Sequence, residues 1–345
     1  MKRSLLVVPL LFALGAGIAR GEDTLLDRRE GRHLRNLRPL TLGGSNAEAY
    51  FSWDGKALIF QSTRDGYACD QIFLMNVDGT HVRLVSTGRG RTTCSFFLPG
   101  NQQIIYASTH ARGPACPPKP DRSHGYVWAL YDYDIHIGNA DGSGLRRLTD
   151  NPRYDAEGAL SPDGKTIVFT SLRAGDLDIY TMDTAGRNVK RLTFEKGFDG
   201  GPFFSWDGTT IVYRAYHPKA SEEIAAYERL LSRDLLRPRR AEIFVMEADG
   251  RKKQQLTHNG AANWAPAFHP NGRQIIFSSN LHDPGTRNFD LYLVNRDGTG
   301  LERITFGGFN SFPFFSPDGE KVVFSSDRRA TGPREFNIFI ADWVP

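Results

Sequence analysis

The chain has 345 residues and a mass of 38.6 kDa, with 40% hydrophobic and 24% charged residues and a mean hydropathy of -0.41. These values are typical of a soluble globular protein and argue against a disordered, collagenous or coiled-coil chain. The 43 basic and 39 acidic residues nearly cancel, so the chain lacks the excess of Lys and Arg on which nucleic-acid binding depends. Its 35 Gly, 19 Pro, 23 Phe and 12 Tyr residues predict short turns between aromatic-rich strands and favour an all-β fold.

The amino terminus has the pattern of an export signal. Lys2 and Arg3 precede an apolar run from Leu5 to Ile18, and Gly21 offers a small residue at a cleavage point. The run of about 14 residues is shorter than the roughly 20 that a membrane-spanning helix needs. We expect residues 1–21 to be a cleaved signal peptide and the mature protein to be periplasmic or secreted and not membrane-spanning. An uncleaved anchor is the alternative.

From residue 37 onward, one sequence unit recurs six times. Its most regular copy, residues 159–194, reads ALSPDGKTIVFTSLRAGDLDIYTMDTAGRNVKRLTF. The spacings between the aligned turn residues are 46, 63, 44, 64 and 47, a period that suits a β-propeller blade. Those turn residues are Asp54, Gly100, Asp163, Asp207, Asn271 and Asp318.

Each unit divides into four short extended runs, which in the third copy are residues 158–160, 166–171, 178–182 and 189–193. Turns of the Ser-Pro-Asp-Gly and Asp-Gly kind separate the runs, and both are hairpin chemistry. A four-stranded antiparallel sheet cannot bury both its faces alone, whereas six such sheets packed around an axis can. The sequence therefore predicts a six-bladed β-propeller.

The repeat resembles that of the TolB-like propeller family, which has an F-S-P-D-G turn, an I-x-F-x-S-x-R run, an I-Y-x-M strand and a D-G turn before L-T. The segment SPDGKTIVFTSLRAGDLDIYTMD matches this pattern almost residue by residue. The resemblance covers residues 37–345 and implies the propeller fold, within a family that serves many roles. TolB places an α/β domain before its propeller, whereas we expect only a short basic arm, residues 22–36, between the signal peptide and the first strand. We therefore expect a stand-alone propeller.

The two ends of the repeat region predict how the ring closes. The last copy ends at Phe336 to Trp343, equivalent to a third strand, while Leu37 to Leu42 (LRPLTL) supplies the missing L-T strand. We expect this amino-terminal strand to complete the sixth blade. We expect the preceding arginines to form a solvated tether: Arg28, Arg29, Arg32, Arg35 and Arg38.

The irregular segments should gather on one face of the propeller, because they follow the second or fourth strand of a blade. They are residues 111–129 in blade two, 216–240 in blade four and 281–288 in blade five, and such loops on a rigid scaffold usually carry the site. In the blade-four insertion, Ser221 begins a helical pattern with Ile224, Tyr227 and Leu231 on one side. This helix is either a lid that binds a partner or a strut packed on the propeller rim.

A polar residue stands eight positions before each turn residue, at the predicted mouth of the central channel. With Glu48 and Glu157 two residues further on, these side chains form a candidate ligand-binding ring that suits a divalent cation or a polar ligand. The alternative is that each caps its own turn through an Asx hydrogen bond. The six residues are Asn46, Thr92, Asp155, Asp199, Asn263 and Asn310.

Cysteine and histidine residues map to the same face. Export favours one disulfide among Cys69, Cys94 and Cys116, with the pairing left open; a Cys/His metal site that includes His110 and His124 is the alternative. His110 and His217 occupy a repeat position held elsewhere by Arg, and His282 lies one residue further along. These three are candidate metal ligands, or structural replacements of the arginines.

Common catalytic motifs are missing from the sequence: it has no G-x-S-x-G elbow, H-E-x-x-H helix or glycine-rich phosphate loop. We therefore assign no catalytic residue and no cofactor, and leave a bound divalent cation as the alternative. The leading interpretation is an exported, non-catalytic propeller that binds a protein, peptide or envelope ligand on its insertion-bearing face. The alternative is a metal-dependent polysaccharide lyase or hydrolase that acts at the channel mouth through His110, His217, His282 and the acidic ring.

Overall fold

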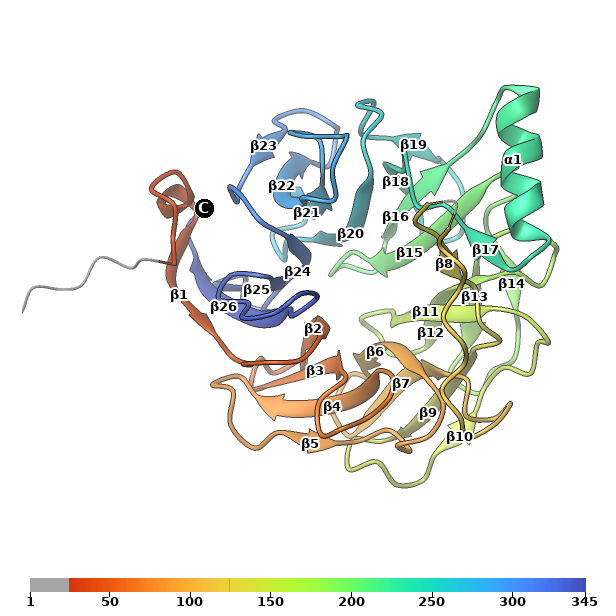
Figure 1. Cartoon of the computed structure of the whole chain (residues 1–345), viewed down its shortest axis with the longest axis horizontal. Coiled ribbons are helices and arrows are strands. Elements are labelled where there is room, and N and C mark those ends of the chain that lie inside the picture. Colours follow the sequence, from red (N-terminus) through yellow and green to blue (C-terminus); the bar gives the residue numbers. More distant parts are fainter. Residues whose placement is uncertain (1–24, 124) are drawn as a thin grey trace, which may run out of the picture.

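The computed structural model describes residues 25–123 and 125–345. The expected signal peptide and His124 lie outside the described residues. Six four-stranded antiparallel sheets surround one axis, as Figure 1 shows. The prediction of a six-bladed propeller is confirmed.

Each blade runs from an innermost strand to an outer strand, which has only two residues in blades one to five. Blades one to three consist of β2 (Asn46–Phe51), β3 (Ala57–Ser62), β4 (Gln71–Asn76) and β5 (Arg83–Leu84); β6 (Thr92–Phe97), β7 (Gln103–Ser108), β9 (Asp134–Asn139) and β10 (Arg146–Arg147); and β11 (Asp155–Leu160), β12 (Thr166–Ser171), β13 (Asp178–Asp183) and β14 (Lys190–Arg191). Blades four and five consist of β15 (Phe198–Phe204), β16 (Thr210–Tyr216), β18 (Glu242–Glu247) and β19 (Gln254–Gln255); and β20 (Asn263–Phe268), β21 (Gln274–Ser279), β22 (Asp290–Asn295) and β23 (Glu302–Arg303). Blade six contains β24 (Asn310–Phe315), β25 (Lys321–Ser326), β26 (Asn337–Trp343) and the amino-terminal β1 (Leu34–Pro39).

The middle strands are buried on both faces because neighbouring blades cover them. In β12, Ile167, Val168 and Phe169 are fully buried although they alternate between the two faces of the sheet. This explains why these strands read as continuous apolar runs rather than as an alternating pattern. The core is therefore a ring of blade interfaces.

The Thr of the L-T motif fixes the short fourth strand to the third. In blade three, Thr193 Oγ1 accepts a hydrogen bond of 2.9 Å from the backbone N–H of Ile179 and donates one of 3.4 Å to Asp178. Blades two, four and five repeat this arrangement with Thr149, Thr257 and Thr305. One side chain thus anchors an element of only two residues.

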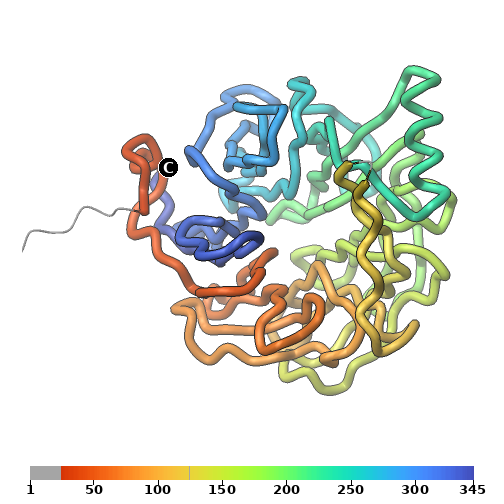
Figure 2. Tube along the Cα trace, viewed as in Figure 1, coloured from red at the N-terminus to blue at the C-terminus, as the bar shows by residue number. Residues whose placement is uncertain are grey.

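The amino terminus closes the ring, as the sequence predicted. Strand β1 pairs antiparallel with β26, and Figure 2 shows the two ends of the described chain running side by side. Thr41 plays the L-T role for this blade, because its hydroxyl accepts a bond of 2.9 Å from the N–H of Ile338. The strand begins at Leu34, three residues earlier than the L-T pattern indicated.

The basic arm differs from the expectation of a solvated tether. Its arginine side chains are exposed, but a 3-10 helix, η1 (Glu30–Arg32), packs on the propeller with Glu30 buried and ion-paired to Arg328. His33 stacks on Trp343 at a ring-centroid distance of 5.1 Å. Because arginines recur along this segment, the sequence did not indicate that Glu30 and His33 are buried.

The blade-four insertion contains the predicted helix, α1 (Ser221–Leu231). Tyr227 and Leu231 are buried against Leu172 and Phe198, and the Tyr227 hydroxyl donates a hydrogen bond of 2.5 Å to Asp176. The packing is that of a strut on the rim of the propeller.

The two large insertions also join each other, which the sequence did not indicate. Strand β8 (Trp128–Ala129) of the blade-two insertion pairs antiparallel with β17 (Leu235–Leu236) of the blade-four insertion. Figure 1 shows β8 crossing the face of the propeller toward β17.

Within the described part of the chain, no helix has the length and apolarity to span a membrane.

Candidate functional site

Every innermost strand carries a β-bulge where the register with the second strand shifts, after the second residue of the strand in five blades and after the third, Gly200, in blade four. The residue that follows adopts a positive φ, between 48° and 60°. A bulge removes a residue from the hydrogen-bond ladder and redirects its side chain, and positive φ is uncommon for residues other than Gly. The six bulge residues are Glu48, Cys94, Glu157, Gly201, Ala265 and Phe312.

All six bulge residues line a central cavity of about 700 Å³ on the insertion-bearing face. Aromatic side chains form much of its wall, including Tyr133, Tyr154, Trp128 and Trp264. The insertions of blades two and five contribute lining residues, among them Trp128 and Arg287. The cavity therefore lies on the face that the positions of the insertions predicted.

The axis beneath the cavity is filled by four aromatic rings. Tyr50, Phe96, Phe203 and Phe314 each contact the other three, with centroid distances of 5.1 to 5.8 Å. They come from neighbouring positions of four innermost strands, two residues beyond the bulge residue. We call these four residues the aromatic plug; it makes the cavity a blind funnel.

A buried ion pair holds one side of the cavity. The guanidinium of Arg214 donates to Glu157, whose carboxylate also accepts hydrogen bonds of 2.7 Å from Thr170 and from the backbone N–H of Gly201. Arg214 lies 5.6 Å from the ring centroid of Trp128. Because the partners satisfy Glu157, this pair is a rigid part of the wall.

Glu48 is held differently. One of its carboxylate oxygens is buried and has no hydrogen-bond partner among the described residues. Burial raises the pKa of Glu48 to about 7, and the nearby Glu157 adds to the rise, while a hydrogen bond with the Cys94 thiol opposes it. Burial likewise raises the pKa of that thiol. The funnel therefore contains a carboxyl group that takes up or gives off a proton near neutral pH.

A second cavity of about 720 Å³ adjoins the first and shares Tyr126, Trp128, Trp264 and Arg287 with it. Arg287 stacks on Tyr126, 3.9 Å from the ring centroid. No Asp or Glu is among the described residues that line this second cavity. Six exposed basic side chains line the two cavities together: Lys119, Arg122, Arg239, Arg240, Arg287 and Arg334.

The sequence-predicted ring divides into two groups. Glu48 and Glu157 line the funnel. The other six candidates are fully buried and hydrogen-bonded: Asn46, Thr92, Asp155, Asp199, Asn263 and Asn310. Asn46 and Asn310 donate to the carbonyl oxygen three residues earlier, at 2.9 and 2.8 Å, as capping residues do.

The sequence did not indicate Arg214 as a residue of the site, because it stands within an apolar strand.

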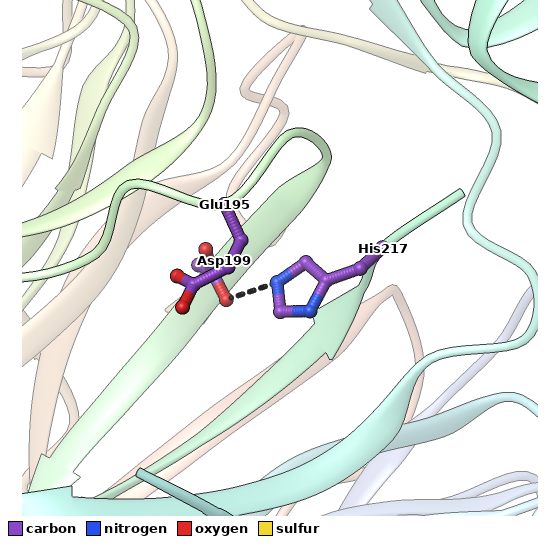
Figure 3. A group of neighbouring side chains, drawn as sticks. All are labelled: Glu195, Asp199 and His217. Carbon is purple, nitrogen blue, oxygen red and sulfur yellow. Dashed lines mark hydrogen bonds and ion pairs between the residues drawn. The ribbon is translucent and has the colours of Figure 1, made fainter. Parts of the chain in front are cut away.

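The three candidate histidines lie in three different blades, each bonded to a residue of its own blade. His110 Nδ1 lies 2.7 Å from Ser108 Oγ, His217 Nε2 lies 3.0 Å from Asp199 Oδ1, and His282 Nε2 lies 3.4 Å from Asp290 Oδ2. The structure groups His217 with Glu195 and Asp199 instead, and Figure 3 shows these three side chains facing one another.

One pair of cysteines forms the disulfide. Cys69 and Cys116 are bonded, with their Cα atoms 5.9 Å apart, while Cys94 is free and lines the funnel. The bridge fastens the blade-two insertion to blade one. Spacing in the sequence could not select this pair, because all three cysteines lie on the same face.

The family model described as TolB beta propeller domain matches residues 127–237 and 235–339, more than half of the chain. A putative TolB from Agrobacterium tumefaciens is 19% identical, over 89% of this chain and 94% of its own, with a TM-score of 0.59. For TolB from Acinetobacter baumannii the identity is 18%, over 87% of this chain and 64% of its own, with a TM-score of 0.57.

An oligogalacturonate lyase from Vibrio parahaemolyticus also shares the fold, with 13% identity over 90% of this chain and 93% of its own and a TM-score of 0.52. At such identities, the likeness to each of these structures concerns the fold alone. No curated protein matches the chain.

Proposed function

Because the chain belongs to the TolB beta propeller domain family, we propose that it is an exported, non-catalytic binding protein whose funnel receives a segment of a protein or peptide. The observation that carries this proposal is the pair of adjoining cavities, aromatic within and basic at their exposed side chains. Aromatic and Arg residues are the groups that contribute most to protein–protein contacts.

The charges indicate the kind of segment that would bind. The acidic residues deeper in the funnel include Glu157 and Asp70, which are paired with Arg214 and Arg91. Of the six exposed basic side chains, Arg240 is paired with Glu223 at 3.1 Å, and we expect the other five to face an incoming ligand. Opposite charge increases both association rate and selectivity. A segment with apolar side chains and one or more carboxylates fits this surface.

The disulfide supports the exported location. Structural disulfides persist in oxidising compartments and are rare in the cytosol, and Cys69 and Cys116 are bonded in this chain. Direct support for the location would come from the mass of the protein isolated from an envelope fraction, with removal of residues 1–21 as the expected result.

A peptide selection tests the proposed function. Peptides selected from a random display library on the mature protein should be enriched in acidic and apolar residues. Their affinity, measured by fluorescence anisotropy, should fall with added salt and fall at least tenfold in Trp128→Ala and Trp264→Ala, whose rings are in edge-to-face contact at 4.3 Å.

The matched control is Leu301→Ala, which removes an exposed apolar side chain from the β22–β23 turn on the opposite face. This variant should bind as the unmodified protein does. Equal affinity in all three variants would place binding elsewhere, and selection of no peptide at all would contradict the proposal. The alternative of a lyase or hydrolase predicts turnover on a polysaccharide panel, but its three histidines lie in separate blades.

A further inference from the structure

Blades three and four place different side chains around the same buried carboxylate. In blade three, Asp155 accepts hydrogen bonds from Ser171 at 2.5 Å, from Arg173 at 2.9 Å and from Asn151 at 3.2 Å. These donors stand 16 and 18 residues after Asp155 and four before it. The carboxylate is thereby satisfied, as burial of a charged group requires.

In blade four, all three donor positions have changed around the equivalent Asp199. Ala215 replaces the serine and directly opposes Asp199 in the strand pairing, as Ser171 opposes Asp155. His217 replaces the arginine, and Glu195 replaces the asparagine. The other five blades keep the serine, as Ser62, Ser108, Ser171, Ser279 and Ser326.

These changes leave Asp199 with too few partners. It is fully buried, and its Oδ2 atom has no hydrogen-bond partner among the described residues. Its Oδ1 atom lies 3.0 Å from His217 Nε2. Burial raises the pKa of Asp199, the hydrogen bond with His217 and its charge oppose this rise, and the carboxylate of Glu195 adds to it. The nearby ammonium of Lys196 is directed to Glu228 and Asp176, at 3.1 and 3.6 Å.

We propose that Glu195, Asp199 and His217 bind one divalent transition-metal ion of the zinc type. The ligand atoms of the three residues lie within 4.8 Å of one another, and Figure 3 shows the two carboxylates beside each other with the imidazole of His217 directed at Asp199. Glu195 is exposed, and its carboxylate accepts a hydrogen bond of 3.3 Å from the backbone N–H of Phe194. The side chain would give up this long bond to move the short distance that metal bonds of about 2.0 to 2.2 Å require. The ion supplies the positive charge that the arginine supplies in blade three.

The donor set selects the kind of ion. One imidazole nitrogen and two carboxylates suit zinc and related transition metals, whereas calcium takes six to eight oxygen ligands. With three protein ligands, water would complete the coordination. His217 directly follows β16 and precedes α1, so the ion would tie the start of the blade-four insertion to β15.

The experiment uses the mature protein without a histidine tag, stripped with a chelator and then dialysed. Zinc binding is measured by isothermal titration calorimetry and native mass spectrometry, and a cobalt-loaded sample is read by its visible absorption. We expect one zinc ion per chain, no stoichiometric calcium, and a cobalt spectrum that reports nitrogen and oxygen ligands. Zinc affinity should fall at least tenfold in His217→Ala.

A repair variant distinguishes this site from surface binding. Glu195→Asn, Ala215→Ser and His217→Arg together restore the blade-three residues, so this protein should fold, melt at least as high as the stripped parent, and bind no zinc. His110→Ala, which removes the histidine at the equivalent position of blade two, should keep the ion. Zinc that stays bound to the repair variant, zinc lost from His110→Ala, or no stoichiometric zinc on the parent protein would each overturn the proposal.

Discussion

Glu48 combines a strained backbone with an unsatisfied carboxyl group. Its φ is 53° and one of its oxygens is buried without a partner. Such features cost stability and persist where the surrounding structure enforces them. Here the six-fold ring of bulges enforces the conformation, so Glu48 is held at the funnel wall by the whole propeller rather than by its own preference.

The raised pKa of Glu48 predicts a pH-dependent stability. Because the folded-state pKa of about 7 exceeds that of the unfolded chain, the folded state holds an extra proton; this contribution is complete below about pH 4.5 and is lost as the pH rises through 7. Glu48→Gln should therefore gain stability over the parent between pH 5 and pH 8, by up to about 2 to 3 kcal/mol. Urea unfolding at the two pH values measures this gain.

Asp54→Asn serves as the control of opposite sign. A hydrogen bond from Ser52 is the main cause that lowers the pKa of Asp54 below 3.8, so the stabilising contribution of this carboxylate is present above that pH and is lost only in more acidic solution. Asp54→Asn should therefore be less stable than the parent by nearly the same amount at pH 5 and at pH 8. If Glu48→Gln and the parent show the same stability difference between pH 5 and pH 8, the carboxyl group is not buried in the way described.

At the scale of the elements, the blade-two insertion is fastened at both ends. The disulfide between Cys69 and Cys116 holds its beginning, and the pairing of β8 with β17 holds its end. The backbone N–H of Leu130 adds a hydrogen bond of 2.8 Å to the carbonyl of Asp234. The blade-two insertion, which contributes Trp128 to the funnel lining, is thus fixed to the propeller at both ends.

Loss of the disulfide should destabilise the protein measurably. Cys116→Ser should lower the free energy of unfolding by about 2 to 4 kcal/mol, because the crosslink restricts the unfolded chain. A reducing agent should lower the stability of the parent to that of Cys116→Ser and leave the variant unchanged, as followed by urea unfolding. Cys94→Ser is the matched control and should respond to reduction as the parent does. A parent protein insensitive to reduction would contradict the pairing.

At the scale of the whole molecule, the repeat made most of the fold predictable. Each copy specifies its own turns and strands, so the blade number, the closing strand and the insertion-bearing face could be predicted from the sequence alone. Of the funnel lining, Glu48 and Glu157 were predicted, but the bulges were not, because Glu48, Cys94 and Phe312 are not residue types that indicate positive φ. The pairing of β8 with β17 was also hidden, since two-residue strands carry no periodicity.

Closure of the ring predicts how the protein unfolds. Deletion of residues 22–44 removes β1, with Leu34 and Leu37 of the core, and exposes β26 as an edge. We expect this variant to lose its cooperative thermal transition in circular dichroism. Arg35→Ala changes an exposed side chain of the same strand and should melt like the parent. An unchanged melt after the deletion would mean that the ring does not depend on β1.

The aromatic plug determines how a ligand can enter and leave the funnel. Because Tyr50, Phe96, Phe203 and Phe314 fill the axis, nothing can be threaded from one side of the propeller to the other. A ligand must therefore enter and leave the funnel through the same opening, on the insertion-bearing face. A chain terminus or a tight loop can do so, whereas the middle of an extended chain cannot pass through without first displacing the four rings.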